Sequence, residues 1–291
     1  MQYIEHIVIL IALYSVLALS LDLLAGYTGQ FSLAHAAYWG VGAYTFGILA
    51  ISGLSWSLCF IAAILVGGIS GCVSGFPSLR LGGDQFVIGT FAAQAVFVDI
   101  LKNWTSMTGG PSGLSAIPNM VFGNVPSGSD VFVCATVVFA LFTTWFCYRV
   151  VHAPVGRVME AIREDTILAQ SCGKNVVLTK LAVFVTSGAF AAGAGALYAS
   201  YVTFIDPSTF SFGESVFIIT IVIAGGAGTL FGPLMCAAML LLFQESLRAV
   251  GLPSILVANL RGIAYGALLI ALVVLRPQGL LGSRAFDFRR G

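Results

Sequence analysis

The residues that could perform chemistry in this 291-residue chain are few, and their spacing matches no catalytic arrangement. There is no Walker A sequence, no histidine pair at a metal-binding spacing and no nucleophile-elbow serine. The six cysteines are scattered, which predicts small packing groups rather than a metal or redox centre. No cluster of basic residues is dense enough for nucleic acid. We therefore expect no catalytic residue, no metal, no cofactor and no nucleic-acid partner.

The remaining chemistry is hydrogen bonding by neutral polar residues in apolar surroundings, an arrangement that could line a path for a small solute. Glycine-rich breaks at 26–32 and 225–233 carry polar residues beside long apolar stretches. Helix ends at such breaks can meet a polar group within a membrane protein. The candidates for the solute path are Gln30, Ser32, His35, Tyr38, Tyr44, Gly226, Gly228 and Thr229.

These candidates have structural alternatives. Ser32 and Thr229 could instead cap helices, Ser32 at a helix that starts near Leu33. His35 could be a packed, hydrogen-bonded histidine. Asp22, which closes the first apolar stretch, is expected to accept from nearby backbone more readily than to contact solute.

The elements that position these residues are apolar helices. The chain is 58% hydrophobic and only 9% charged, which excludes a soluble domain. Its apolar stretches of about 20 residues predict an all-α polytopic membrane protein with one domain over residues 1–291. The first stretch is expected to be a transmembrane helix and not a cleaved signal. The expected spans are 4–24, 35–51, 56–75, 86–101, 131–151, 181–201, a split segment at 215–243, and 258–275.

The split segment leaves the number of transmembrane helices at eight or nine. Two apolar arms of about 10 residues each flank the break at 225–233. They could form one discontinuous helix, with Pro233 in the first turn of the second arm. Alternatively, they could be two tilted spans joined by a tight turn.

Residues 149–180 differ from the rest of the chain because they are rich in charge. Eight of these 32 positions are charged, and five of the eight are basic. Positive residues are enriched in cytoplasmic connections, which places loop 152–180 and the basic C-terminus in the cytoplasm. The nearly uncharged connection 103–130 is then outside, and the protein spans the membrane lipid.

This charged segment has the periodicity of an amphipathic helix. One mostly apolar stripe is formed by Val155, Met159, Ile162, Thr166 and Ala169. Ile167 and Leu168 fall near the charged side, and apolar side chains among charges are typical of a helix seated in a partner's groove. A helix lying on the membrane surface is the alternative.

The sequence GRVMEAIRED at 156–165, followed by Ala169 and Gly173, resembles the EAA-type loop of ABC importer permeases. Ile162 replaces a second alanine of the strict consensus, and Gly173 lies further along than its glycine, so the match is to a variant. In that family the loop forms the coupling helix that docks into an ATPase subunit. The resemblance implies that the ATPase-coupling residues are Arg157, Glu160, Ala161, Ile162, Arg163, Glu164, Asp165, Ile167, Leu168 and Gly173.

Other motifs follow in the order found in branched-chain amino acid permeases, and the chain resembles the LivM-type subunit. They are GYTGQFSLAHAA at 26–37, GVGAY at 40–44, RLGGDQF at 80–86, TGGPSGL at 108–114, GGAGTLFGP at 225–233 and RPQGLLG at 276–282. The resemblance implies an importer with a second, different permease, two ATPase subunits and an extracytoplasmic binding protein. This chain would then hydrolyse nothing itself and would lie in the inner membrane of a bacterium.

Three other functions fit parts of the sequence. A urea or short-chain amide permease of the same family would share every motif. An ion-coupled secondary transporter would need ionisable groups deep in several helices, whereas Asp99, Glu245 and Arg261 fall at or near expected helix ends. An accessory membrane protein would not need glycine-broken segments in both halves.

Overall fold

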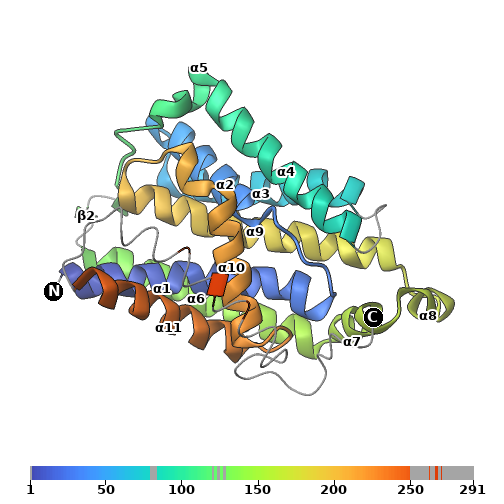
Figure 1. The fold of residues 1–291 in the computed structure, drawn as a ribbon. Coiled ribbons are helices and arrows are strands. Elements are labelled where there is room, and N and C mark those ends of the chain that lie inside the picture. The colour runs from blue at the N-terminus through green and yellow to red at the C-terminus, as the bar shows by residue number, and fades with distance from the viewer. Residues whose placement is uncertain are drawn as a thin grey trace.

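The structure of the chain, a computed structural model, is a bundle of helices (Figure 1). It describes residues 2–78, 84–119, 121–122, 125–126 and 129–249, together with Gly262, Gly266, Ala267 and Ile270. The long helices are α1 (Gln2–Asp22), α2 (His35–Ile51), α3 (Trp56–Ser78), α4 (Asp84–Asn103), α6 (Ser129–His152), α7 (Pro154–Glu164), α9 (Val176–Val202), α10 (Phe212–Gly225) and α11 (Phe231–Ala249). The shorter elements are the π-helical η1 (Leu23–Tyr27), α5 (Thr105–Thr108), η2 (Gly110–Ser112), α8 (Thr166–Ser171), η3 (Pro207–Phe210) and the paired strands β1 (Val121–Phe122) and β2 (Val125–Pro126).

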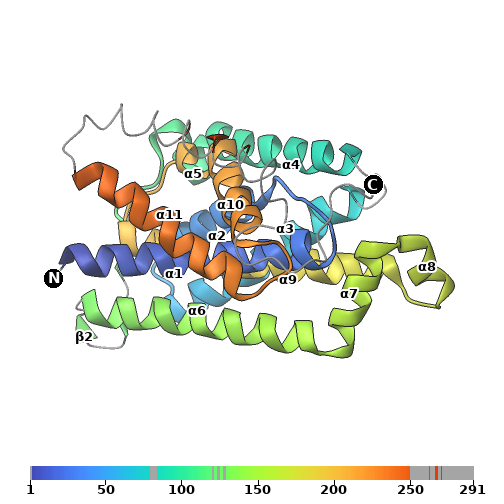
Figure 2. The same cartoon turned by 60° about the horizontal axis from the view of Figure 1, so that its bottom comes forward.

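The most enclosed helix is α1, which continues directly into η1. Its sequence is apolar on all sides, as expected for a helix that other helices or lipid surround completely. It packs against α6, α9, α10 and α11, and residues 12–28 are all buried (Figure 2). The core of the bundle is therefore centred on α1, the first apolar stretch of the chain.

Glycines bring α9 into close contact with α2 and α3. A β carbon on Gly195 would lie 2.0 Å from the carbonyl oxygen of Trp39, and one on Gly42 would lie 2.1 Å from that of Ala192. On the α3 side, a β carbon on Gly67 would lie 2.1 Å from Cβ of Ala192. Small residues allow the dispersion contacts that hold helices together in lipid, so α2, α3 and α9 form one tightly packed unit.

The two ends of the bundle carry different connections. The helices α7 and α8 lie at one end, near the start of α4 (Figures 1 and 2). The start of α1, the helix α5 and the β pair lie at the opposite end (Figures 1 and 2). The described parts of connection 103–130 and the helices of loop 152–180 are therefore at opposite ends of the bundle, and the assignment of the loop to the cytoplasm stays a prediction.

The expected spans up to residue 243 all correspond to observed helices. The prediction for 35–51 coincides with α2, while α9 begins five residues before its expected start at 181. Five helices of the described part are long and apolar enough to cross a membrane, which supports a multi-pass membrane protein. The last expected span, 258–275, lies outside the described ranges, so the total of eight or nine stays a prediction.

The split segment forms two separate helices. Its arms are longer than the sequence suggested: α10 has 14 residues and α11 has 19, about 21 Å and about 28 Å of helix. The second length approaches the roughly 30 Å of the hydrocarbon layer, so α11 is not a half-length arm. The two helices run in different directions in both views (Figures 1 and 2). The structure therefore favours tilted helices joined by a tight turn over one discontinuous helix.

Substitution of Gly67 by alanine is expected to destabilise the bundle. The new methyl group would meet Cβ of Ala192 at 2.1 Å and the carbonyl oxygen of Gly188 at 2.7 Å. Overpacking of this kind costs about 1–3 kcal/mol. Thermal unfolding of the purified variant in detergent should show a lower midpoint than wild type.

The matched control is the neighbouring Gly68→Ala. There the nearest atom to the new methyl group is Cγ1 of Val185 at 3.4 Å, an ordinary van der Waals contact. This variant should unfold close to the wild-type midpoint. Equal midpoints for the two variants would contradict the close approach of α3 and α9.

Candidate functional site: two glycine-rich breaks and the α7–α8 segment

The first break separates η1 from α2. Gly29 adopts a left-handed conformation with φ of +70°, and the N–H of Gln30 donates to the carbonyl of Leu24 at 2.9 Å. The connection then turns back along α1, so α2 begins inside the length of the bundle (Figures 1 and 2). The first N–H groups of a helix have no partner within the helix. Other groups must therefore bind them in the interior.

Three buried side chains from α4 and α10 accept hydrogen bonds from this start of α2. The bonds are Leu33 N to Thr90 Oγ1 (3.1 Å), Ala36 N to Ser215 Oγ (3.0 Å) and Ala37 N to Gln94 Oε1 (2.7 Å). The amide nitrogen of Gln94 also donates to the carbonyl of Phe210 at 2.8 Å. A single side chain therefore joins α2, α4 and the turn before α10.

Further hydrogen-bonded polar residues lie beside the start of α2. Nε2 of His35 is 2.9 Å from Oγ of Ser20, and Ser187 donates to the carbonyl of Ser20 at 2.6 Å. The hydroxyl of Tyr38 is hydrogen-bonded to Oγ of Ser74. His35 and Tyr38 are both fully buried. In this structure His35 is thus packed and hydrogen-bonded, and its contact with a solute stays a prediction.

The second break folds on itself between α10 and α11. Gly226 and Gly228 have φ of +110° and +81°, a backbone conformation that residues other than glycine rarely adopt. The hydroxyl of Thr229 donates to the carbonyl of Gly226 at 2.6 Å and so closes the turn. A β carbon on Gly225 would lie 2.4 Å from the carbonyl carbon of Gly232. The glycines are therefore needed for both the turn and the close approach of its two sides.

The two breaks meet each other. Oδ1 of Asp22 accepts from the N–H of Gly228 at 2.8 Å, across 206 residues of sequence. Nη1 of Arg163, in the last turn of α7, donates to the carbonyl of Gly26 at 2.7 Å. A β carbon on Gly26 would lie 2.2 Å from the backbone nitrogen of Gly228. The residues Asp22, Gly26, Arg163 and Gly228 thus form one cluster, which we call the glycine junction.

The α7–α8 segment presents one face to the bundle and one to solvent. Met159, Ile162 and Ala169 are buried as the apolar stripe predicted, but Val155 is half-exposed. Contrary to the expected single helix, the segment is broken at Asp165, whose backbone is extended. Its Oδ1 accepts from the N–H groups of Ile167 and Leu168 at 2.8 and 3.0 Å and caps α8.

The outward side of this segment is a groove of about 420 Å³. Its lining residues are Pro154, Arg157, Val158, Ala161, Glu164, Asp165, Leu168, Ala169, Cys172 and Lys174. Leu168 is 63% exposed and Ile167 is 74% exposed, so both apolar side chains are open to a partner. Gly173, at φ of +74°, ends α8 and turns the chain toward α9.

Two acidic residues, Glu214 in the first turn of α10 and Asp206 just before η3, are held by hydrogen bonds. Glu214 accepts from the hydroxyl of Tyr14 at 2.9 Å. Burial acts to raise the pKa of Asp206, but hydrogen bonds from the hydroxyls of Ser208 and Thr209 outweigh it and lower that pKa. Asp206 therefore stays ionised and fixes the turn η3 that carries Phe210.

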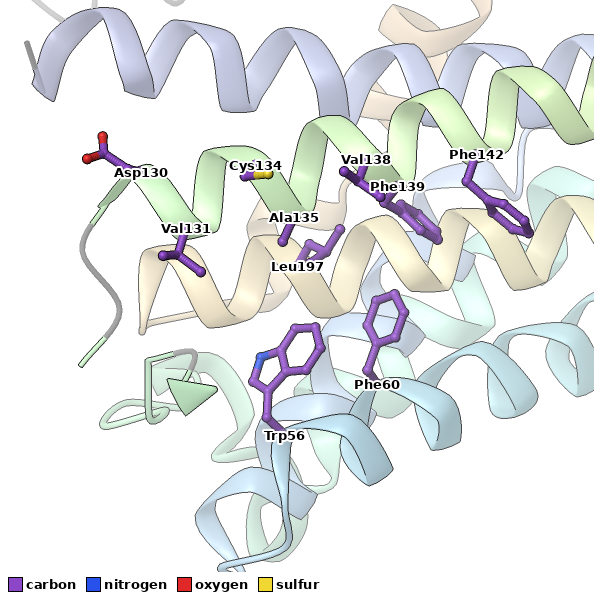
Figure 3. Close-up of a pocket in the computed structure, with 10 residues that line it drawn as sticks. All are labelled: Trp56, Phe60, Asp130, Val131, Cys134, Ala135, Val138, Phe139, Phe142 and Leu197. Atoms are coloured by element: carbon purple, nitrogen blue, oxygen red, sulfur yellow. The ribbon is translucent and has the colours of Figure 1, made fainter. Parts of the chain in front are cut away.

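A larger groove of about 670 Å³ lies between α3, α6 and α9 (Figure 3). Trp56 and Phe60 line one side of it, and Val138, Phe139 and Phe142 line the other (Figure 3). Asp130 is the one charged lining residue. Because its walls carry so few hydrogen-bonding groups, this groove is better suited to bind lipid or another apolar helix than a zwitterionic solute.

The structure brings most of the predicted solute-path residues to two places. Ser32, His35 and Tyr38 lie at the start of α2, and Ser32 accepts from the N–H of Ala34 at 3.3 Å although α2 begins two residues later than expected. Tyr44 lies further along α2, with its ring edge-on to Phe210.

The other candidates belong to the breaks themselves. Gln30 is buried in the first break. Gly226, Gly228 and Thr229 form the turn of the second break, which reaches the first at the glycine junction. The part of each candidate in solute passage stays a prediction.

Sequence reasoning missed Thr90, Gln94 and Ser215. All three are neutral polar residues within expected spans, Thr90 and Gln94 in 86–101 and Ser215 at the start of the split segment, and polarity within an apolar span is the signal that could have identified them. Arg163 was assigned to the ATPase surface, whereas its side chain is 15% exposed and points to Gly26.

Comparison with known proteins places these features in a family. The sequence model of the family described as "Branched-chain amino acid transport system / permease component" matches residues 3–273. The LivM permease proteins of Salmonella typhimurium and Escherichia coli are each 33% identical over 92% of this chain and 68% of their own length.

More distant relatives have other names. A probable LivM protein of Methanocaldococcus jannaschii is 24% identical over 78% of this chain and 68% of its own length. An autoinducer 2 import permease, LsrD, of Salmonella typhimurium is 26% identical over 87% of this chain and 77% of its own. No solved structure matches the chain. The match over nearly the whole length, with the two LivM relatives, shows that this chain belongs to the branched-chain amino acid transport permease family.

Proposed function

We propose that the chain is the transmembrane permease subunit of a binding-protein-dependent ABC importer. It translocates branched-chain or other hydrophobic amino acids, with ATP hydrolysed by partner subunits. The observation that carries this proposal is the 33% identity to the LivM permeases over 92% of the chain. The motifs of both glycine-rich breaks and of the α7–α8 segment lie within the matched residues.

The proposed partners are a second permease, two ATPase subunits and an extracytoplasmic binding protein. The α7–α8 groove supports an ATPase partner, because the exposed Leu168 lines it together with Arg157 and Glu164. The neighbouring residue Ile167 is exposed as well. Apolar side chains ringed by charge are typical of a small docking surface. The charge of the segment supports placing it in the cytoplasm of the cell, with the permease in the inner membrane.

Transport then follows from two global states of the bundle that ATP and the loaded binding protein stabilise differently. The helix α7 suits rigid-body transmission because it is locked to its neighbours. A β carbon on Gly156 would lie 1.9 Å from the carbonyl oxygen of Val151 in α6, and Met159 is fully buried beside η1. A displacement of α7 must therefore move α6 and η1 with it.

The solute itself belongs to the proposal. The LsrD relatives are named as importers of autoinducer 2, so similar chains serve unlike solutes. Within this chain, the polar start of α2 is a suitable place for a solute to bind, because Thr90, Gln94 and Ser215 could exchange a backbone partner for a solute group. Such exchange provides hydrogen bonds without burying a net charge.

The proposal predicts that cells lacking this chain lose high-affinity uptake of labelled leucine and keep that of labelled urea. Restoring the wild-type gene should restore leucine uptake, and an empty vector serves as the control. Loss of urea uptake alone would instead identify a urea or amide permease of the same family. Unchanged uptake of both would contradict both solute assignments.

The double substitution Glu160→Lys and Leu168→Asp should leave the protein inserted but uncouple it from ATP. Both side chains are exposed on the α7–α8 segment, so the bundle should fold normally. We expect the ATPase subunits to co-purify at least about tenfold less, since interface hot spots of this kind are worth 2 kcal/mol or more.

The control is Leu54→Asp, which changes an exposed leucine outside the α7–α8 segment. This variant should keep the ATPase subunits bound. Wild-type co-purification and wild-type ATPase activity in the double variant would contradict docking. A helix lying on the membrane surface would then explain the segment better.

A further inference from the structure

Arg163 is oriented differently from the other charged residues of α7. Arg157, Glu160 and Glu164 are exposed, whereas the side chain of Arg163 is 15% exposed. Its Nη1 donates to the carbonyl of Gly26 at 2.7 Å, and its Nη2 lies 3.4 Å from the carboxylate of Glu164. The guanidinium group thus reaches from the end of the α7 helix into the first glycine-rich break.

At Gly26 and Gly228 a side chain would come close to neighbouring atoms of the glycine junction. A β carbon on Gly26 would lie 2.1 Å from Oδ1 of Asp22. One on Gly228 would lie 3.1 Å from Nη1 of Arg163 and 3.2 Å from the carbonyl oxygen of Gly26. Gly228 therefore lies beside the guanidinium group and also donates its N–H to the carboxylate of Asp22. A larger residue there would crowd the guanidinium group and the Gly26 carbonyl.

The carboxylate of Asp22 is only partly bonded. The residue is 1% exposed, and its Oδ1 accepts from the N–H of Gly228. Its Oδ2 is buried and has no hydrogen-bond partner among the residues that the structure describes. A buried carboxylate gains strongly from a second, charged donor. The guanidinium of Arg163 is the charge on the far side of Gly228.

The glycine junction therefore contains two acceptors: the carbonyl of Gly26, to which Arg163 donates here, and the carboxylate of Asp22, to which Gly228 donates. The first belongs to the break after α1. The second is bonded to the turn between α10 and α11. If the guanidinium group of Arg163 moved from one acceptor to the other, the contact between the two breaks would change. Because α7 carries Arg163, this change would be linked to the position of α7.

We propose that Arg163 is a positioning residue that transmits movement of α7 to the glycine junction, by moving its guanidinium group between the Gly26 carbonyl and the Asp22 carboxylate. The proposal rests on the proposed function, since it needs a partner that moves α7. It explains why an arginine within the docking segment points away from the docking surface. It also gives the junction two discrete arrangements, as coupling between distant sites requires.

The test uses the whole importer, reconstituted in liposomes with its ATPase subunits and binding protein. Labelled leucine uptake and phosphate release are measured together, which gives the number of solutes moved per ATP. Arg163→Ala should lower that ratio at least about fivefold while phosphate release stays within about twofold of wild type. Asp22→Asn keeps an acceptor for Gly228 but removes the charge, and should lower the ratio similarly.

The double variant Arg163→Ala with Asp22→Asn should be no worse than either single variant, because the two residues act as one unit. If the double variant lowered the number of solutes moved per ATP by the product of the two single effects, the proposal would be overturned. A merely structural role would lower uptake and phosphate release in parallel and leave the ratio at the wild-type value, which would also overturn it. Arg149→Ala, an exposed arginine near the end of α6, should leave both measurements unchanged.

Two further comparisons keep the outcome decisive. If Arg163→Ala does not accumulate in the membrane, Arg163→Lys replaces it, because lysine keeps the charge but loses the planar fork of donors. Its ratio should fall at least about threefold, and a wild-type ratio would overturn the proposal. If the wild-type complex moves no leucine, the proposed function fails; if it does so and the variants keep its ratio, only the role of Arg163 fails.

Discussion

A backbone that leaves helical geometry inside an apolar bundle must find new hydrogen-bond partners, and this constraint explains most of the interior of the protein. Water is not there to bind free N–H and C=O groups, and each unpaired group costs several kcal/mol. Both glycine-rich breaks create such groups. Their partners are Thr90, Gln94 and Ser215 at the start of α2, and Asp22 and Arg163 at the glycine junction.

The same constraint decides which helices must lie close together. A side chain of α4 can cap α2 only if α2 lies against α4, and Asp22 can reach Gly228 only if α1 packs beside the α10–α11 turn. Glycine and alanine make this proximity possible along α2, α3 and α9. The arrangement of the bundle thus follows from small residues, and the polar bonds then fix the register between helices.

The sequence predicted the helices much better than the contacts between them. Apolar stretches of about 20 residues predicted the bounds of α2, and those of the other spans up to residue 243 to within about six residues. Periodicity also predicted that Met159 and Ile162 are buried and that Ile167 and Leu168 lie away from the buried stripe. It failed at Asp165, because a residue that caps a following helix has the same spacing as one within a continuous helix.

The contacts between helices could not be predicted from the sequence, because they join residues far apart in the chain. Nothing near Asp22 indicates that its partner is 206 residues away, and the motif around Arg163 suggested an outward side chain. Once the coordinates place the two together, the breaks at 26–32 and 225–233 are no longer separate features. They form one contact to which α7 is attached.

This attachment separates two tasks that a permease must perform at different depths. Under the proposed function, a solute would need neutral hydrogen-bonding groups within the bundle, and such groups lie at the start of α2. A soluble partner needs exposed apolar side chains at one end, which α8 provides. A rigid helix with one inward arginine can connect the two, because α7 is fixed to α6 by close backbone contact and to η1 by a charged hydrogen bond. Under the proposed function, a partner that moves α7 would therefore act on the breaks through these two contacts.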